Sequence, residues 1–358
     1  MRHYPEIERR LAEIEERGLR RSLVEIEPID ATRGRLGNQE VHLFCTNDYL
    51  GLAELPEMRA AWSGAGCGSS RLISGTRPAH RALEDALAER FGDRALVFSS
   101  GYQANLALLS TLFGPGDRVA SDRLAHASLI DGLKLSRAEV EIVPHGEPSP
   151  NPTGLRGVVL EGLYSMDGDK PDLSRYEGHG WRVIDEAHAV GCLGPEGRGV
   201  AADQGLVPDA LVGTLGKAYG AAGAFVVGPE PLIELLVSRG RSFIYTTALA
   251  EPAARAAQLG ISLATSERRE QLAERVCRFR QGLADLGLPT SGQDHVVPLL
   301  SGEKTMALSQ QLLDCGYYVP GIRAPTVAPG QERLRFSLSA AHTDDQIDGV
   351  LEVLARCC

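Results

Sequence analysis

Lys217 is the residue whose surroundings best suit covalent chemistry. It lies in the segment Thr214-Leu-Gly-Lys-Ala-Tyr-Gly220, where small and apolar residues flank it on both sides. Desolvation of a charged ammonium in such a setting lowers its pKa, and the neutral amine is the nucleophile that a Schiff-base lysine needs. On this segment alone, a structural lysine beside a turn is an equally good interpretation.

Two glycine-containing segments fail the nucleotide-binding patterns that they approach. A P-loop around Lys217 would need glycine at position 211 and serine or threonine at position 218, where the chain has Leu211 and Ala218. The segment Gly66-Cys-Gly-Ser-Ser-Arg71 has arginine in place of the third glycine of the dinucleotide fingerprint. Neither segment therefore predicts a nucleotide site.

Asp185 and His188 follow the apolar run Trp181–Ile184. In an open α/β sheet, ligands bind outside the carboxyl ends of the strands. A carboxylate there can pair with a ring nitrogen and keep it protonated, which is what pyridoxal 5'-phosphate (PLP) needs to act as an electron sink. His188 could reach the same ligand. The structural alternative for Asp185 is the N-cap of a helix.

The letters Asp185-Glu-Ala-His188 also spell a helicase box, which would indicate a nucleic-acid-dependent ATPase. That function requires a P-loop upstream, and the chain has none. The formal net charge of -10 also opposes a nucleic-acid partner, which would call for a basic face.

Three further segments are suited to binding. Phe98–Asn105 has the pattern of a strand, a glycine-containing turn and a helix start, which makes an anion site. His126 follows the run Arg118–Ala120 and could stack on a flat cofactor, and Asn47 lies in a polar loop after Val41–Phe44. A capped turn, a structural histidine and an ordinary loop are the respective alternatives.

The elements that must position these residues alternate between strands and helices. Apolar runs indicate strands, and patterns of period 3.6 indicate helices, at Pro78–Arg90 and Gln103–Leu112 among others. This order predicts a mainly parallel α/β sheet. The expected strands of the sheet are Ala95–Phe98, Arg118–Ala120, Val140–Val143, Val158–Leu160, Arg182–Ile184, Leu211–Val212 and Ala224–Val227.

Three regions are expected along the chain. Residues 1–40 would form an amphipathic helix over 4–17 and an arm, residues 41–250 the large α/β domain, and residues 251–358 a smaller α+β domain. In the last region we expect one long helical stretch, Ala253–Leu286, then strands near His295–Leu300 and Arg333–Leu338 with a helix at Thr305–Cys315 between them. A capping box, Thr343-Asp-Asp-Gln346, predicts the start of the final helix.

The composition limits the class of protein and its cellular compartment. The 358 residues are 43% hydrophobic and 23% charged, which is ordinary for a soluble globular protein. Seven scattered cysteines without a C-x-x-C pair indicate reduced thiols in the cytoplasm and no metal site. The charged N-terminus does not resemble a secretory signal. The low-charge run Leu211–Gly228 contains a lysine and few large apolar residues, so we expect no membrane span.

Taken in order, these segments resemble the α-oxoamine synthase family of fold-type I PLP-dependent transferases, from about residue 18 to the C-terminus. The matching segments are Thr46–Leu52, Gly68–Thr76 with His80 and Leu83-Glu84, Ser99–Tyr102, Asp122–Ser128, Glu161–Asp169, Asp185–His188 and Gly213–Lys217. The resemblance implies the fold of that group, with a large, mainly parallel sheet domain and a smaller α+β domain. It also implies a homodimer with active sites at the subunit interface.

The resemblance also implies residue roles. Lys217 would hold PLP and move the Cα proton, and His126, Asp185 and His188 would complete the catalytic set. The cofactor would be bound by Gly101, Tyr102, His126, Ser165, Asp185, His188, Thr214 and Lys217. Substrate would be contacted by Arg20, Asn47, His126, Thr326 and Arg335, with the Arg335 guanidinium on the amino-acid carboxylate.

Within the family, Ile322–Val327 and Arg333–Leu338 are most similar to the branch that condenses L-alanine with a pimeloyl thioester of CoA or of acyl carrier protein. Siblings use glycine or serine with other acyl thioesters. The chain departs from the family at His145–Gly157, which is shorter than expected, so a surface helix has been trimmed or the acyl entrance changed. The sequence leaves the acyl chain and its carrier open.

Overall fold

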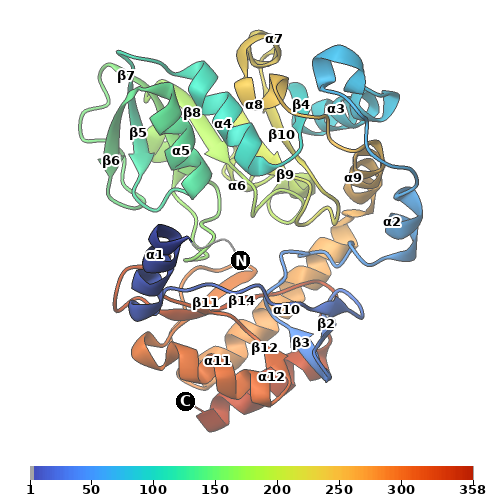
Figure 1. The fold of residues 1–358 in the computed structure, drawn as a ribbon, viewed down its shortest axis with the longest axis vertical. Helices are drawn as coiled ribbons and strands as arrows, with labels where there is room; N and C mark the ends of the chain where they lie inside the picture. The colour runs from blue at the N-terminus through green and yellow to red at the C-terminus, as the bar shows by residue number, and fades with distance from the viewer. Residues whose placement is uncertain (1–3, 358) are drawn as a thin grey trace.

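A seven-stranded sheet forms the centre of the upper part of the molecule in Figure 1. The structure is a computed structural model that describes residues 4–357. Its strand order is β4-β10-β9-β8-β7-β5-β6. Only β10 runs antiparallel to its neighbours, so the expectation of a mainly parallel α/β sheet is confirmed. The strands are β4 (Arg94–Phe98), β5 (Arg118–Asp122), β6 (Glu139–Val143), β7 (Leu155–Glu161), β8 (Trp181–Asp185), β9 (Ala210–Thr214) and β10 (Ala224–Gly228).

Successive residues of these strands face opposite sides of the sheet, and helices cover both sides. Leu96 and Phe98 of β4 pack in one buried cluster with α4, α5, α7 and α8, whereas Ala95 and Val97 pack in the other with α3 and α9. The helices of the upper part are α2 (Pro56–Ala61), α3 (Pro78–Phe91), α4 (Gly101–Leu112), α5 (Ala127–Ser136), α6 (Val200–Asp203), α7 (Glu230–Arg239), α8 (Arg241–Ile244) and α9 (Glu251–Leu263), with a π-helical turn η1 (Arg71–Gly75) and short 3-10 turns η2 (Leu173–Tyr176) and η3 (Pro195–Gly197).

The lower part combines two small sheets with helices. One sheet has the order β1-β2-β3-β12 and the other β11-β14-β13. The elements are β1 (Glu27–Pro28), β2 (Arg33–Leu36), β3 (Gln39–Leu43), α10 (Ser266–Asp285), β11 (Val296–Leu300), η4 (Gly302–Lys304), α11 (Thr305–Asp314), β12 (Tyr317–Tyr318), β13 (Gly321–Ile322), β14 (Arg333–Ser337) and α12 (Asp344–Cys357). The N-terminal arm therefore shares a sheet with the C-terminal third of the chain, through the parallel pair of β3 and β12.

Helix boundaries in the lower part follow their caps. The expected capping box is present, because Gln346 N donates to Thr343 Oγ1 at 3.3 Å and Thr343 N donates to the Gln346 side chain at 2.9 Å. The single long helix expected over residues 253–286 is two helices instead. The chain leaves α9 after Leu263, and the Thr265 hydroxyl caps α10 by accepting from Arg268 N at 3.4 Å.

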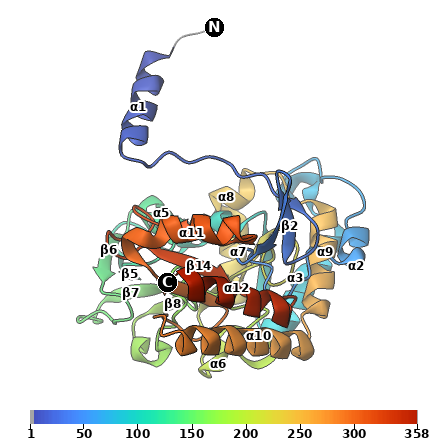
Figure 2. The same ribbon diagram turned by 90° about the horizontal axis from the view of Figure 1, so that it is seen from below.

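Helix α1 (Pro5–Glu16) stands apart from the rest of the molecule in Figure 2, joined to it by an extended segment. It confirms the helix expected over residues 4–17. Ile7, Leu11 and Ile14 remain 56%, 42% and 39% exposed, so its apolar stripe faces solvent in the single chain.

Within residues 4–357, the cysteines that the structure describes are free thiols, while Cys358 lies outside the described residues. No described helix has the length and apolar character that crossing a membrane would require. The described part of the chain also contains no cluster of acidic, histidine and cysteine side chains that could hold a metal ion.

Candidate active site

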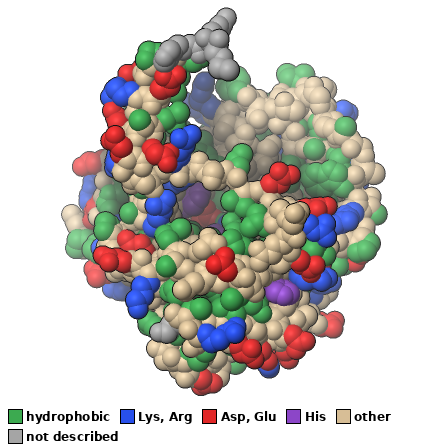
Figure 3. All heavy atoms as spheres, turned by 60° about the horizontal axis from the view of Figure 1, so that its bottom comes forward, with side chains coloured by type: hydrophobic (Ala, Val, Ile, Leu, Met, Phe, Trp, Pro, Cys, Tyr) green, Lys and Arg blue, Asp and Glu red, His purple; other side chains and the backbone are tan. Residues whose placement is uncertain are grey.

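The carboxyl edge of the large sheet gathers most of the residues that the sequence singles out. Asp185 ends β8, Lys217 lies in the loop after β9, and His126 begins α5 after β5. Because β5, β8 and β9 run in the same direction, their carboxyl ends open on one side, where the lower part of the molecule faces them (Figure 1). Figure 3 shows a hollow between the two parts with histidine and acidic side chains inside it.

Lys217 has the depressed pKa that its sequence setting predicts. Burial of the amine lowers its pKa to about 8, although Asp185 and Glu161 oppose that shift. The Lys217 Nζ atom lies 2.8 Å from His188 Nε2. A substantial fraction of this amine is therefore neutral near pH 8, as a nucleophile and proton carrier requires.

Asp185 is held by two hydrogen bonds. Its Oδ2 accepts from Asn105 Nδ2 at 2.7 Å, and its Oδ1 accepts from Ala187 N at 3.0 Å. The second bond is the local backbone contact that the capping alternative calls for, whereas the first comes from α4 across the site. Asp185 therefore has a local turn contact and a fixed orientation at the carboxyl end of β8.

Glu161 is a buried carboxyl group beside Asp185 that sequence reasoning missed. The two residues end neighbouring strands and pair in register. Burial, with the Asp185 charge as the next cause, raises the pKa of Glu161 to about 8. Its Oε1 accepts from the backbone N–H of His126 at 2.7 Å, so this carboxyl group positions the first residue of the α5 cap.

His126 is exposed and caps α5. Its Nδ1 lies 2.7 Å from Ser128 Oγ and accepts from Ser128 N at 3.2 Å, while Ser128 also accepts from Asn105 at 2.9 Å. These bonds fix the plane of an exposed imidazole next to Asp185, which suits stacking on a flat ring. Burial lowers the pKa of His126, which favours a neutral imidazole.

The start of α4 provides room and donors for a phosphate. Ser100 caps the helix by accepting from Gln103 N at 3.3 Å, and no atom within 4 Å would meet a Cβ placed on Gly101. The Tyr102 phenol bonds to Asp131 on α5, so only its backbone is available at this helix start. Thr214 Oγ1 donates to Gly223 O at 3.2 Å, which fixes the loop that leads to Lys217.

Arg335 reaches the site from β14 of the lower part. Its Nε donates to Ser165 O at 2.6 Å and its Nη1 donates to Ser337 Oγ at 2.8 Å. The residue is only 6% exposed. These two bonds orient a planar guanidinium beside the Lys217 amine, whose pKa it helps to lower, and such a group suits a carboxylate ligand.

Among the other expected substrate contacts, the structure brings only Asn47 into this cluster, where its side chain accepts from the Tyr49 hydroxyl at 3.0 Å. Thr326 is exposed, and its backbone N–H donates to Arg323 O at 3.0 Å. Arg20 follows α1 and pairs with Glu15 at 2.9 Å, with both side chains 59% exposed. In the single chain Arg20 is therefore paired with a residue of α1 and exposed to solvent.

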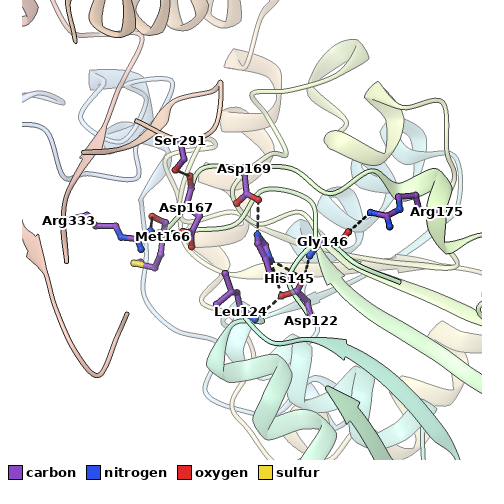
Figure 4. Close-up of polar contacts among 10 residues, drawn as sticks. All are labelled: Asp122, Leu124, His145, Gly146, Met166, Asp167, Asp169, Arg175, Ser291 and Arg333. Carbon is purple, nitrogen blue, oxygen red and sulfur yellow. Dashed lines mark hydrogen bonds and ion pairs between the residues drawn. The ribbon is translucent and has the colours of Figure 1, made fainter. Parts of the chain in front are cut away.

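A histidine network beside the hollow is the second feature that sequence reasoning missed (Figure 4). His145 Nδ1 lies 3.0 Å from Asp122, and its Nε2 lies 2.7 Å from Asp169 Oδ2. Burial alone would lower the pKa of His145, but the bonds to these two carboxylates raise it to about 10. The imidazolium therefore ties the turn that leads to His126 to the loop that follows Ser165.

The lower part of the molecule holds the same loop. Arg333 of β14 donates to Asp167 Oδ1 at 2.6 Å and to Met166 O at 3.1 Å (Figure 4). Arg333 is 3% exposed, whereas the side chain of Asp167 is 27% exposed, so this ion pair is shielded from water on the arginine side. His145 is also the first residue of the stretch His145–Gly157, which the sequence predicts to be shorter than in the family that the chain resembles, and in the structure it contacts both Asp122 and Asp169.

These observations fit PLP. The Lys217 amine, whose pKa is lowered, would bond the aldehyde, and the fixed Asp185 carboxylate would bond the ring nitrogen. The exposed His126 imidazole would stack on the ring face, and the open helix start at Gly101 would hold the phosphate. The two parts of the chain meet around this set, so a substrate bound there would be contacted by both.

Comparisons with known proteins identify the family of the chain. A family model described as aminotransferase class I and II matches residues 39–354. The 8-amino-7-oxononanoate synthase of Methylococcus capsulatus is 44% identical over 372 residues, covering 96% of this chain and 96% of its own. The serine palmitoyltransferase of Sphingomonas wittichii superposes with a TM-score of 0.90 at 33% identity, covering 98% of this chain and 96% of that chain.

Three further structural matches bear on the cofactor and on the branch of the family. Serine palmitoyltransferase structures that contain PLP superpose with TM-scores of 0.88. The 8-amino-7-oxononanoate synthase of Francisella tularensis superposes with a TM-score of 0.77 at 30% identity, covering 88% of this chain and 97% of that chain.

Proposed function

The chain belongs to the class I and II aminotransferase family, in its α-oxoamine synthase branch, and from this premise we propose that it is an 8-amino-7-oxononanoate synthase of biotin biosynthesis. Membership of the family implies the PLP cofactor, the fold and an acyl-transfer reaction. The finer proposal is the reaction, a decarboxylative condensation of L-alanine with a pimeloyl thioester. The observation that carries it is the 44% identity with a protein of that name over nearly the full length of both chains.

The proposed chemistry assigns one task to each side chain. PLP, when bound, supplies an electron sink for the carbanion at the substrate Cα. Lys217, with its pKa near 8, removes the Cα proton and later returns one. The Asp185 carboxylate keeps the ring nitrogen protonated, and Arg335 holds the amino-acid carboxylate until it leaves as CO2. His126 and His188 hold the ring in place from the loops after β5 and β8.

The acyl donor is proposed as a thioester of CoA or of acyl carrier protein. The candidate residues for contacting it are Asn47, which is half-buried and bonded to Tyr49, and Thr326 and Arg20, which are both exposed. Arg20 is exposed and paired with Glu15 in one chain, so a role for it in substrate binding requires this ion pair to open.

A homodimer in the cytoplasm is part of the proposal. Leu72 and Ile73 of η1 are 48% and 81% exposed, and Tyr245 after α8 is 73% exposed. We call these three residues the η1–α8 patch; the two segments lie side by side, where Ala248 N donates to Ser69 O at 3.0 Å. A buried ion pair of Arg71 with Glu84 at 2.8 Å holds η1 rigid, as a surface that packs against a second copy requires.

A sibling activity is the second candidate. The serine palmitoyltransferase of Sphingomonas wittichii covers 98% of this chain with a TM-score of 0.90, which favours serine and a long-chain thioester as the competing pair. Glycine C-acetyltransferase activity is the other sibling. The ATPase alternative for Asp185–His188 no longer applies, because the chain belongs to a PLP-dependent family.

The deciding experiment crosses alanine, glycine and serine with pimeloyl, acetyl, succinyl and palmitoyl thioesters, and scores thiol release. We expect the highest kcat/KM for alanine with the pimeloyl thioester. Alanine should exceed glycine by about 10–200-fold, since one methyl group in a pocket contributes ~1–3 kcal/mol. A higher kcat/KM for serine with palmitoyl-CoA, or for glycine with acetyl-CoA, would assign the sibling activity and leave cofactor and fold unchanged.

A further inference from the structure

A buried chain of hydrogen bonds joins Asn47 to Lys217 through two other side chains. The Tyr49 hydroxyl donates to Asn47 Oδ1 at 3.0 Å and lies 2.6 Å from His188 Nδ1. The other nitrogen of that ring, Nε2, lies 2.8 Å from Lys217 Nζ. Tyr49 is 0% exposed and His188 is 8% exposed, so the bond between them is shielded from water, whereas Asn47 and Lys217 at the two ends are half-buried.

The protons in this chain can be counted. Burial, and then the charges of Lys217 and Arg335, hold the pKa of His188 well below its usual range, so its ring is neutral and carries one N–H. Burial raises the pKa of Tyr49 to about 12, so the phenol keeps its proton. With one proton on the phenol and one on the imidazole, the four side chains of this path can be hydrogen-bonded in two arrangements.

In the first arrangement the phenol donates to Asn47, and His188 Nδ1–H donates to the phenol oxygen. Nε2 then has a bare lone pair, which accepts from the Lys217 ammonium. In the second arrangement the phenol donates to Nδ1, so Nε2 carries the proton and donates to the lone pair of the neutral Lys217 amine. Passing from the first to the second moves one ammonium proton to Nε2 and releases one proton from Nδ1, by way of the phenol, to solvent.

We propose that Tyr49 sets which nitrogen of His188 carries the proton, and that the Asn47 carbonyl decides this by holding or releasing the phenol. A substrate group that occupies Asn47 Oδ1 frees the phenol and so favours the neutral form of Lys217, the form that removes a proton. This last step rests on the proposed function, in which Asn47 contacts substrate. Tyr49 thus acts through His188 as a positioning residue.

Other groups also face this chain, and they separate its effect from simple electrostatics. Asp185 and Glu161 raise the pKa of Lys217, and Arg335 lowers it; Arg335 also faces the Tyr49 phenol, and His126 and His295 face His188. None of them is altered by replacing Asn47, whose side chain is uncharged. An effect of Asn47 on Lys217 that travels through Tyr49 is therefore lost when Tyr49 is replaced, whereas an effect by another route remains.

The test measures the pKa of Lys217 in the full chain freed of cofactor, by acetylation with acetic anhydride across a pH series and mass spectrometry of the Lys217 peptide. It needs no substrate, so it can fail while the proposed function holds, and the reverse. Exposed Lys304 in the same samples is the internal control. Variants are Asn47→Ala, Tyr49→Phe and the double substitution, with circular dichroism to check the fold.

We expect Asn47→Ala to lower the pKa of Lys217 by about half to one pH unit, a three- to tenfold change in neutral amine at fixed pH. In the Tyr49→Phe background the same substitution should change it by less than about 0.2 unit, because coupled residues lose additivity. An unchanged pKa in Asn47→Ala, or an equal shift in both backgrounds, overturns the proposal. Should Asn47→Ala misfold, Asn47→Asp, which keeps an acceptor oxygen, must instead raise this pKa, and by less with Phe at position 49.

Discussion

At the scale of single residues, the site depends on burial more than on close ion pairs. Burial is the largest cause acting on the pKa of Lys217, of Glu161 and of His188. It favours a neutral amine, a protonated carboxyl group and a neutral imidazole around Asp185. The site therefore places Asp185 beside two groups, Lys217 and Glu161, whose pKa values lie near 8, which suits a reaction made of proton transfers at carbon.

Lys217→Ala should abolish covalent attachment of PLP. Borohydride should fix the cofactor to Lys217 in the natural protein and to no peptide of the variant, and turnover should fall by about 10²–10⁴-fold because the proton carrier is lost. Because burial lowers the pKa of Lys217 to about 8, uptake of PLP by the cofactor-free protein should rise with pH to a plateau, with a midpoint near that value. Lys304→Ala is the matched control. A PLP-labelled peptide from Lys217→Ala would show that another residue holds the cofactor.

Asp185→Asn separates the electrostatic role from the capping alternative. Asparagine caps as well as aspartate, so the bond from Ala187 N can persist and the unfolding midpoint should change little. The lost charge should raise the Kd of PLP about tenfold, the effect of losing ~1.5 kcal/mol of an ionic hydrogen bond, and should remove most turnover. Near-natural turnover and PLP affinity in this variant would instead support a purely structural aspartate.

At the scale of elements, three loops at the carboxyl edge of the sheet are joined by His145. Asp122 ends β5, His145 follows β6, and Asp169 lies in the loop after β7. Asp122 also accepts from the backbone N–H groups of Leu124 and Gly146, at 2.7 and 2.9 Å (Figure 4). The turn that presents His126 is thus braced by a charged side chain from the neighbouring loop.

His145→Gln should make the protein less stable in a pH-dependent way. The two aspartates raise the pKa of His145 from 6.5 to about 10 in the folded state. Its stabilising effect is therefore complete below about pH 6.5 and is lost as pH rises to about 10. In urea denaturation, the free energy of unfolding of the variant should be lower than that of the natural protein by about 1–3 kcal/mol at pH 6, and this difference should disappear by pH 10. His179→Gln is the control. A gap that stays constant from pH 6 to pH 10 would contradict the charged form of His145.

At the scale of the whole molecule, sequence reasoning was most successful where patterns are local. The strands of the large sheet, the helix starts at Gly101 and Asp344 and the order of the site segments follow from apolar runs, caps and motifs. The Tyr49–His188 and Asn105–Asp185 contacts join residues 139 and 80 positions apart, which no local pattern specifies. The residues of β12 and β13 were missed because two-residue strands have no periodicity. The domain limits at residues 40 and 250 stay predictions.

The dimer is tested by charging the η1–α8 patch. Ile73→Glu should shift sedimentation from dimer to monomer and reduce turnover, because a buried carboxylate at an apolar contact costs several kcal/mol. Val207→Glu is a matched control, since Val207 is 77% exposed against 81% for Ile73 and lies outside the patch. An active natural protein that sediments as a monomer at assay concentration would overturn the dimer itself.

The pairing of β3 with β12 has a consequence for how the chain is made. Phe44, which follows β3 and is 0% exposed, packs against Phe279, Phe336 and His342. Residue 44 leaves the ribosome long before Phe279, Phe336 and His342 are synthesised. Phe44 therefore lacks these packing partners while the entire large sheet is being synthesised. The large sheet can be completed during translation, whereas the lower part closes only after the last helix has emerged. Truncation before β12 would therefore leave β3 without its parallel partner strand and Phe44 without its contacts to Phe336 and His342.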